Sequence, residues 1–282
     1  MKNIAVGLVG GGFMGKAHSL AYSAVNMFFW PSDFQPVKHS IAEATTELAD
    51  HAATRFGFQH STDNWRELVD NPDIDVIDIA TPNNTHAEIA IAALEAGKHV
   101  ICEKPLALTT DEAKDMVKAA DSSGLVNMVA FNYRRTPAVT LAKKYIEEGA
   151  IGDVLNFRGT YLQDWSADPN SPLSWRFQKS VAGSGAIGDI LTHVLDMARY
   201  LVGEVDEVNA LTQHIITERP TQASGVDSLG TVKGGTDTPM APVDVEDEVL
   251  SLLKFANGAV GSVEATRNAW GRNNFLTFEI HG

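Results

Sequence analysis

The chain has 282 residues, more than a single domain usually has, so two domains are expected. Hydrophobic residues make up 44% and charged residues 21% of the chain, which is typical of a globular protein with an ample core. The net charge of −14, together with the lack of any basic run, argues against a nucleic-acid or anionic-membrane surface, because either needs a local excess of lysine and arginine.

The first residues and the cysteine content bear on the cellular compartment. The apolar run at the N-terminus is too short and too rich in glycine for a signal peptide, and no stretch of about 18 apolar residues is present to span a membrane. Cys102 is the single cysteine, so no disulfide forms within the chain and a reducing compartment is expected. We therefore expect a cytoplasmic protein that does not contact a membrane.

Short apolar runs alternate with helical patterns over the first 130 residues. Capping boxes at two predicted helix starts pair Thr85 with Glu88 and Thr109 with Glu112. The predicted strands span Ile4–Gly10, Val37–Ala44, Ile74–Ala80, His99–Cys102 and Val126–Phe131. This alternation predicts an α/β fold in which residues 1–130 form a doubly wound parallel sheet, a dinucleotide-binding Rossmann domain.

The turn after the first predicted strand is rich in glycine. Its sequence, GGGFMG, fits the pattern G-x-G-x-x-G and opens a helix predicted from Met14 to Val25. Such glycines permit a tight turn and let a pyrophosphate approach the N–H groups at the helix N-terminus. The turn therefore predicts dinucleotide binding, with a purely structural turn as the alternative. The cofactor-binding candidates are Gly10, Gly12, Phe13, Met14 and Gly15.

An acidic residue at the end of the second strand is expected to bind the adenosine ribose, and Glu43 is the candidate. Glu43 lies farther from Gly15 than the usual ~20 residues, and we interpret Asn26–Pro36 as an insertion that explains the excess. No arginine adjoins Glu43, and a carboxylate without a guanidinium repels a 2′-phosphate, so NAD is favoured over NADP. The alternative is a solvated glutamate at a helix start.

The second half of the chain predicts an α+β domain over residues 131–282 with a mostly antiparallel sheet. A connecting helix is expected from Pro137 to near Gly149, and an amphipathic helix over residues 182–203. Arg219–Val243 is predicted to be a long loop. The predicted strands span residues 153–165, 207–218, 248–256, 258–268 and 275–282.

Four motifs occur in a characteristic order along the chain. They are the glycine-rich turn, TPNNTH, EKP and GAIGDILTHVLD. Together they resemble the Gfo/Idh/MocA oxidoreductase family, and the resemblance spans nearly the whole chain. It implies that the nicotinamide side of the cofactor site is lined by Thr81, Pro82, Asn83 and His86. It also implies that Glu103 and Lys104 contact cofactor and substrate and that the bond before Pro105 is cis. A surface lysine at a strand end is the alternative for Lys104.

Asp189 and His193 lie four residues apart, on one face of the predicted helix. The resemblance implies that they are the catalytic D-x-x-x-H pair of the family, although Leu191 stands where relatives usually carry glycine. A hydrogen-bonded surface pair is the alternative, and a metal site is disfavoured because no spacing supplies a third ligand. In the implied mechanism His193 takes the hydroxyl proton, Lys104 stabilises the alkoxide and Asp189 binds the substrate or orients the imidazole, although either His193 or Lys104 can be the formal base.

The resemblance implies hydride transfer between NAD and a secondary alcohol of a sugar, anhydrosugar or cyclitol. Flat aromatic faces and a guanidinium suit such a ring, with ordinary packing as the alternative; these side chains are Tyr133, Trp165, Trp175 and Arg176. Two other functions remain open: a regulator that senses the dinucleotide without turnover, and an NAD-dependent glycosidase that acts through a keto-sugar intermediate.

The resemblance also bears on assembly and on the end of the chain. Relatives commonly pair through the open face of the second sheet, which implies a homodimer or homotetramer. Their sequence pattern continues beyond the last strand of this chain. We therefore expect a chain truncated at the C-terminus that leaves Phe275–His281 as an exposed edge strand.

Overall fold

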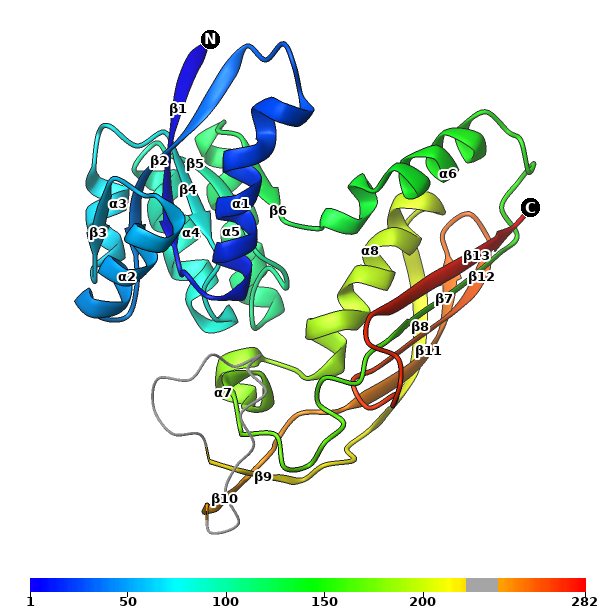
Figure 1. Cartoon of the computed structure of the whole chain (residues 1–282). Helices are drawn as coiled ribbons and strands as arrows, with labels where there is room; N and C mark the ends of the chain where they lie inside the picture. Colours follow the sequence, from blue (N-terminus) through cyan, green and yellow to red (C-terminus); the bar gives the residue numbers. More distant parts are fainter. Residues whose placement is uncertain (222–237) are drawn as a thin grey trace. The chain divides into compact units, whose positions relative to one another are not determined.

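The computed structural model describes residues 1–221 and 238–282, which form two compact units, Met1–Ala130 and Phe131–Gly282 (Figure 1). We call them the N-terminal unit and the C-terminal unit and describe each by itself. The α/β fold class is confirmed: the first unit is built on a parallel sheet and the second on a mostly antiparallel one.

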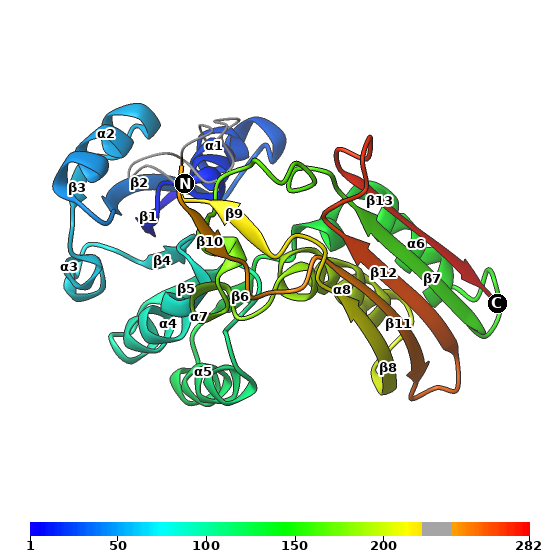
Figure 2. The same ribbon diagram turned by 90° about the horizontal axis from the view of Figure 1, so that it is seen from below.

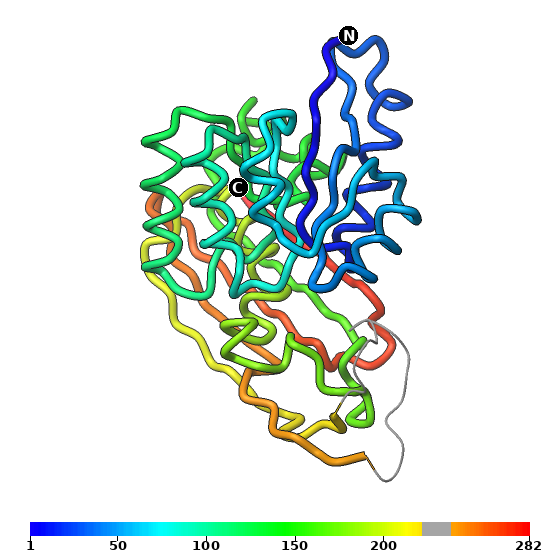
Figure 3. Tube along the Cα trace, turned by 90° about the vertical axis from the view of Figure 1, so that its left-hand side faces the viewer, coloured from blue at the N-terminus to red at the C-terminus, as the bar shows by residue number. Residues whose placement is uncertain are grey.

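The sheet of the N-terminal unit has six strands in the order β3-β2-β1-β4-β5-β6, and all of its pairs are parallel. This is the strand order of a Rossmann fold. The strands are β1 (Lys2–Val9), β2 (Phe34–Ala42), β3 (His60–Thr62), β4 (Val76–Ile79), β5 (His99–Cys102) and β6 (Asn127–Val129). Figure 3 traces β1 and β2 side by side. Sequence analysis missed β3, because its three residues carry no apolar pattern.

Five helices pack on this sheet: α1 (Phe13–Phe28), α2 (Thr46–Phe56), α3 (Trp65–Asp70), α4 (His86–Glu95) and α5 (Thr110–Ser123). The apolar faces of four of them form two clusters with the strands, one with α3, α4 and α5 and a smaller one with α2. The segment Asn26–Pro36, interpreted above as an insertion, contains the end of α1 at Phe28 and the start of β2 at Phe34, and the interpretation stays a prediction.

The two predicted capping boxes have different outcomes. The box of Thr109 and Glu112 at the start of α5 is confirmed. The box of Thr85 and Glu88 is wrong, because the 3-10 helix η1 (Asn83–Thr85) precedes α4. The hydroxyl of Thr85 donates instead to the Oγ1 of Thr81, at 2.6 Å.

The C-terminal unit has a five-stranded sheet in the order β13-β7-β12-β11-β8, which Figure 2 shows strand by strand. The strands are β7 (Asn156–Leu162), β8 (Val205–Gln213), β11 (Glu248–Phe255), β12 (Val260–Thr266) and β13 (Phe275–His281). Only the pair of β7 and β12 is parallel, so the prediction of a mostly antiparallel sheet is confirmed. The predicted strand over residues 153–165 was too long at both ends.

Helices α6 (Pro137–Glu147) and α8 (Thr192–Leu201) cover one face of this sheet (Figure 2). The core there joins Val194, Met197 and Leu201 of α8 to Phe157 and Val263 of the strands. The helix predicted over residues 182–203 was wrong in its first half. Its α-helical part begins at Thr192, and a π-helical turn, η4 (Ile187–Leu191), precedes it.

A separate two-stranded sheet is formed by residues that lie between β8 and β11 in the sequence. Strand β9 (Glu218–Pro220) pairs antiparallel with β10 (Met240–Pro242). The long loop predicted over Arg219–Val243 was therefore wrong at both ends, and its middle, residues 222–237, lies outside the described residues. Among the helices of the described ranges, none has the length and apolar character of a membrane span.

Candidate functional site

The glycine-rich turn between β1 and α1 is tightly closed at two glycines and open at a third. Gly10 has a φ of +96°, and a Cβ added there would lie 2.7 Å from the carbonyl oxygen of Ala80. A Cβ on Gly15 would lie 2.0 Å from the oxygen of Gly10. At Gly12, by contrast, no atom of the described chain beyond Gly12 and its two neighbours lies within 4 Å of an added Cβ. The turn thus leaves open space at the helix N-terminus, where free N–H groups bind a pyrophosphate.

Glu43 lies directly after β2 and against this turn. Its Oε1 accepts a hydrogen bond from the backbone N of Gly11, at 2.5 Å, and its Oε2 accepts one from Ala44, at 3.2 Å. A Cβ on Gly11 would lie 2.8 Å from Oε1. Gly11, which sequence analysis did not single out, is therefore the residue that lets the carboxylate come close to the glycine-rich turn.

The turn after β4 carries the other candidates for cofactor contact, Thr81, Pro82, Asn83 and His86. Asn83 and His86 are buried, and Thr81 and Pro82 are half-buried. The Nδ1 of His86 lies 3.0 Å from the carbonyl oxygen of Pro105, and its Nε2 lies 3.0 Å from that of Thr81. Burial lowers the pKa of His86, and the two carbonyl groups oppose that effect. His86 thus joins the turn after β4 to the turn after β5.

The turn after β5 holds Glu103, Lys104 and Pro105. The Lys104–Pro105 bond is cis, as predicted. Glu103 is buried, and its Oε2 accepts a hydrogen bond from the backbone N of Lys104, at 3.1 Å. Its Oε1 lies 3.0 Å from the Nε2 of His18, a residue of α1 that sequence analysis did not single out. Lys104 itself is half-buried at the carboxyl end of the parallel sheet, the edge where such folds bind ligands.

In the C-terminal unit, His193 lies in the first turn of α8 and is surrounded by aromatic rings. Its ring centroid lies 4.8 Å from that of Tyr133, 6.0 Å from that of Tyr161 and 6.0 Å from that of Phe131. The hydroxyl groups of Tyr133 and Tyr161 are 2.6 Å apart, and burial raises the pKa of Tyr161. The structure thus brings together two predicted residues, His193 and Tyr133, within one aromatic cluster.

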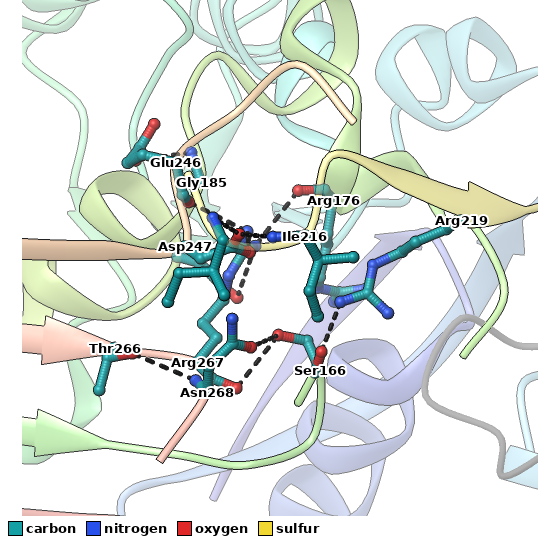
Figure 4. Close-up of polar contacts among 12 residues, drawn as sticks. Ser166, Arg176, Gly185, Ile216, Arg219, Glu246, Asp247, Thr266, Arg267 and Asn268 are labelled. Atoms are coloured by element: carbon teal, nitrogen blue, oxygen red, sulfur yellow. Dashed lines mark hydrogen bonds and ion pairs between the residues drawn. The ribbon is translucent and has the colours of Figure 1, made fainter. Parts of the chain in front are cut away.

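Asp189 lies in the π-helical turn before α8, next to a buried arginine. Its Oδ2 is 3.9 Å from the Nη1 of Arg267, whose side chain is fully buried. The guanidinium of Arg267 also donates to the carbonyl oxygens of Arg176, at 3.3 Å, and Glu246, at 3.2 Å. Figure 4 shows Arg267 with Arg176, Glu246 and Asp247, whose carboxylate lies 3.6 Å from the Arg267 guanidinium. Arg267 therefore places a cation beside a predicted catalytic residue.

Glu246 fixes the segment that leads into this turn. Its Oε1 accepts hydrogen bonds from the backbone N of Gly185, at 2.8 Å, and of Ile187, at 2.9 Å. A Cβ on Gly185 would lie 1.8 Å from the carbonyl oxygen of Glu246, so the close approach requires glycine. Close packing against Glu246 thus explains the glycine at position 185 of the GSGAIG sequence. In the sequence this requirement is visible only as a run of small residues.

The three remaining substrate candidates make contacts of their own. The ring of Trp165 packs on Phe177, with centroids 5.5 Å apart, and the guanidinium of Arg267 lies 5.6 Å from the Trp165 ring. The guanidinium of Arg176 stacks on Trp175, at 4.3 Å. All three are half-buried. Lys104 belongs to one unit and Asp189 and His193 to the other, so their convergence on one substrate hydroxyl stays a prediction.

Comparisons with known proteins give the family. Residues 4–131 match an oxidoreductase family with an NAD-binding Rossmann fold, and residues 139–282 match the GFO/IDH/MocA C-terminal domain. Levoglucosan dehydrogenase of Pseudarthrobacter phenanthrenivorans is 70% identical over 282 residues, which cover 100% of this chain and 72% of that protein. The 1,5-anhydro-D-fructose reductase of Ensifer adhaerens is 31% identical over 248 residues, 86% of this chain and 65% of that protein. A solved structure of levoglucosan dehydrogenase in complex with NADH and levoglucosan is similar to this chain, with a TM-score of 0.92 and 68% sequence identity. The match covers 100% of this chain and 71% of that chain.

Proposed function

Because the chain belongs to the Gfo/Idh/MocA oxidoreductase family, with its NAD-binding Rossmann fold, we propose that it oxidises a secondary alcohol of an anhydrosugar, with levoglucosan as the first candidate. The observation that carries this proposal is the identity to a levoglucosan dehydrogenase along the whole chain. The aromatic and guanidinium groups of the C-terminal unit suit a rigid ring that bears several hydroxyls.

The cofactor of the proposed reaction is NAD. Gly12 leaves room for the pyrophosphate at the N-terminus of α1, and the Glu43 carboxylate beside Gly11 is suited to the adenosine ribose hydroxyls. The same carboxylate would repel a 2′-phosphate, which supports NAD over NADP. Bound NAD supplies the nicotinamide carbon that takes up the hydride.

The residues of the two units divide the remaining chemistry. As the C–H hydride leaves the sugar carbon, the hydroxyl on that carbon loses its proton and becomes a carbonyl. His193 accepts this proton, because imidazole is the side chain whose ordinary pKa, about 6.5, suits a base at neutral pH. The ammonium of Lys104 stabilises the developing alkoxide. Asp189, beside Arg267, accepts a hydrogen bond from a substrate hydroxyl.

We also propose that the protein is a homodimer or homotetramer. One face of the C-terminal sheet is covered by α6 and α8, whereas the other exposes Leu211, Leu250 and Leu252 by 74%, 47% and 65%. These three leucines lie on the neighbouring strands β8 and β11, where Leu250 pairs with Leu211. An apolar patch of this kind is typical of a subunit interface. Light scattering that finds only monomer at micromolar concentration would contradict this.

The experiment that tests the function follows NADH absorbance while levoglucosan, other anhydrosugars, free sugars and inositols are added with NAD or NADP. With levoglucosan as substrate, we expect NAD to be reduced to NADH and NADP to be reduced at a much lower rate. Release of an aglycone from glycosides without net NADH would identify a glycosidase instead. Tight NADH binding with no turnover on any compound would identify a dinucleotide sensor.

A further inference from the structure

A histidine outside the proposed catalytic set lies between two buried carboxylates of the N-terminal unit. The Nδ1 of His18 is 2.9 Å from the Oδ2 of Asp78, and its Nε2 is 3.0 Å from the Oε1 of Glu103. The exposed fractions of these side chains are 16% for His18, 0% for Asp78 and 6% for Glu103. His18 belongs to α1, Asp78 to β4 and Glu103 to the turn after β5, so the histidine connects three elements.

The geometry of these contacts determines the charge of the imidazole. An ionised carboxylate only accepts hydrogen bonds, and a neutral imidazole has one N–H, whereas an imidazolium has two. Both ring nitrogens of His18 face carboxylate oxygens at hydrogen-bond distance, so both donate when Asp78 and Glu103 are ionised. His18 is therefore an imidazolium that donates once to Asp78 and once to Glu103.

The surroundings of His18 keep this charge over a wide pH range. Burial lowers the pKa of His18, but the hydrogen bonds and charges of Asp78 and Glu103 outweigh burial and raise this pKa to about 10. Among the neighbours, the hydroxyl of Tyr22 donates to Asp78 at 2.6 Å. The Cys102 thiol is buried, and its pKa is raised by burial and by both carboxylates. The charge of Glu103 also acts on His86, whose pKa is lowered by burial.

The second carboxylate oxygen of Glu103 connects the contact with His18 to the backbone of Lys104. While Oε1 faces His18, Oε2 accepts the backbone N–H of Lys104. A buried carboxylate that lost its charged donor would have to turn or take up a proton, because burying an unpaired charge is costly. We infer that His18 is a positioning residue that holds Glu103 and, through it, the turn that presents Lys104; its effect on turnover rests on the function proposed above.

Enzyme kinetics test the effect on turnover with a matched control in the same cluster. His18→Gln removes the imidazolium, whereas Tyr22→Phe removes a donor to Asp78 and leaves the contact of His18 with Glu103. Because small displacements of a catalytic group can cost about 100-fold in rate, we expect His18→Gln to lower kcat by up to about 100-fold. Tyr22→Phe should keep most of kcat, and both variants should keep the Kd for NADH. Equal losses in kcat for the two variants would overturn the inference.

A spectroscopic measurement on the unmodified protein tests the same inference without any substrate. In histidine labelled with ¹⁵N, one of the nine side chains should keep the imidazolium pattern at pH 8.5, and its signal should be absent from His18→Gln. The backbone amide signal of Lys104 should follow the deprotonation of this histidine as the pH rises toward 10. A Lys104 amide that does not respond, or a protein with no histidine charged at pH 8.5, would contradict the positioning role even if the enzyme is fully active. Conversely, these signals in a protein that oxidises no sugar would reject the proposed function alone.

Discussion

The two units bury charged clusters that differ in how the cations meet the carboxylates. In the N-terminal unit one imidazolium, His18, lies at hydrogen-bond distance from two carboxylates, Asp78 and Glu103. In the C-terminal unit the guanidiniums of Arg219 and Arg267 are fully buried, and that of Arg267 faces the Asp247 carboxylate at 3.6 Å and the Asp189 carboxylate at 3.9 Å. The cation of the first cluster therefore hydrogen-bonds its carboxylates directly, whereas the guanidinium of Arg267 faces its carboxylates at longer distances.

The pKa shifts of the two clusters follow from this difference. The pKa of His18 is raised to about 10, because the two carboxylates outweigh its burial. The pKa of Arg219 is lowered to about 10, because burial dominates and the charge of Arg267 adds to it, while Asp247 and Asp168 oppose both. Burial acts in the same direction on both cations. His18 hydrogen-bonds both of its carboxylates, whereas Asp247 and Asp168 act on Arg219 through charge alone, and this difference decides which way the pKa finally moves.

The clusters also differ in their other partners. The carboxylates of the N-terminal cluster accept further hydrogen bonds from the hydroxyl of Tyr22 and the backbone N of Lys104. The guanidinium of Arg219 donates to backbone carbonyls, including that of Ser166 (Figure 4), and lies 4.2 Å from the ring of Phe177. The first arrangement holds a backbone turn in place, and the second includes a buried guanidinium, that of Arg267, beside Asp189.

The largest expected effect comes from breaking the C-terminal cluster. Arg267→Met would leave the buried Asp247 carboxylate without that guanidinium and should reduce the free energy of unfolding by about 3–5 kcal/mol. Arg199→Met, which breaks an exposed ion pair with Glu204, should cost less than about 1 kcal/mol. Denaturant unfolding followed by fluorescence measures both. If the two variants lose similar stability, buried charge balance does not govern this unit.

Turnover should require a group from each unit. Lys104→Ala should lower kcat by about 100- to 1000-fold, because it removes positive charge at the developing alkoxide. His193→Ala should cost a similar factor and flatten the rise of activity with pH. Steady-state kinetics with levoglucosan measures kcat, and NADH fluorescence should show little change in cofactor affinity. Near-normal turnover of either variant would remove that residue from the chemistry.

The pKa of His18 predicts how stability depends on pH. Its folded-state pKa of about 10 lies above the ordinary value of 6.5, so its contribution is fully present below pH 6.5, declines above it, and is lost as the pH rises through about 10. The difference in unfolding free energy between the unmodified protein and His18→Gln should therefore shrink by at most about 1.4 kcal/mol per pH unit between pH 7 and 9.5. A difference that stays constant over this range would contradict the imidazolium assignment.

The smallest expected effect concerns the negative charge at the cofactor end of the N-terminal unit. Glu43→Ala should narrow the preference for NAD over NADP by about 10-fold, or ~1.4 kcal/mol, because it removes the carboxylate that would face the 2′-phosphate. The ratio of kcat/KM for the two cofactors measures this preference. Equal values for both cofactors in the unmodified protein would reject the assignment of Glu43.

Much of the fold could be predicted from local sequence patterns. Alternating apolar runs predicted the parallel sheet of the first unit, and Thr109 and Glu112 predicted a capping box that is present. The glycine-rich turn predicted a close backbone approach, which Gly10 and Gly15 make. Each of these features arises from residues close together in the chain, so periodicity and capping rules reveal them.

Only the tertiary structure decided which charged groups meet. His18 contacts partners 60 and 85 residues away, and Arg267 faces Asp189 from another element of its unit. Two local rules also failed: Thr85 hydrogen-bonds to Thr81, four residues earlier, in place of a capping box, and Asp189 lies in a π-helical turn where an α-helix was predicted. The sequence by itself thus determined most of the strands, but not β3, β9 and β10, together with the glycine-rich turn and the candidate residues. The protonation and orientation of buried side chains depend on neighbours that only the folded chain brings together, so no local pattern could reveal them.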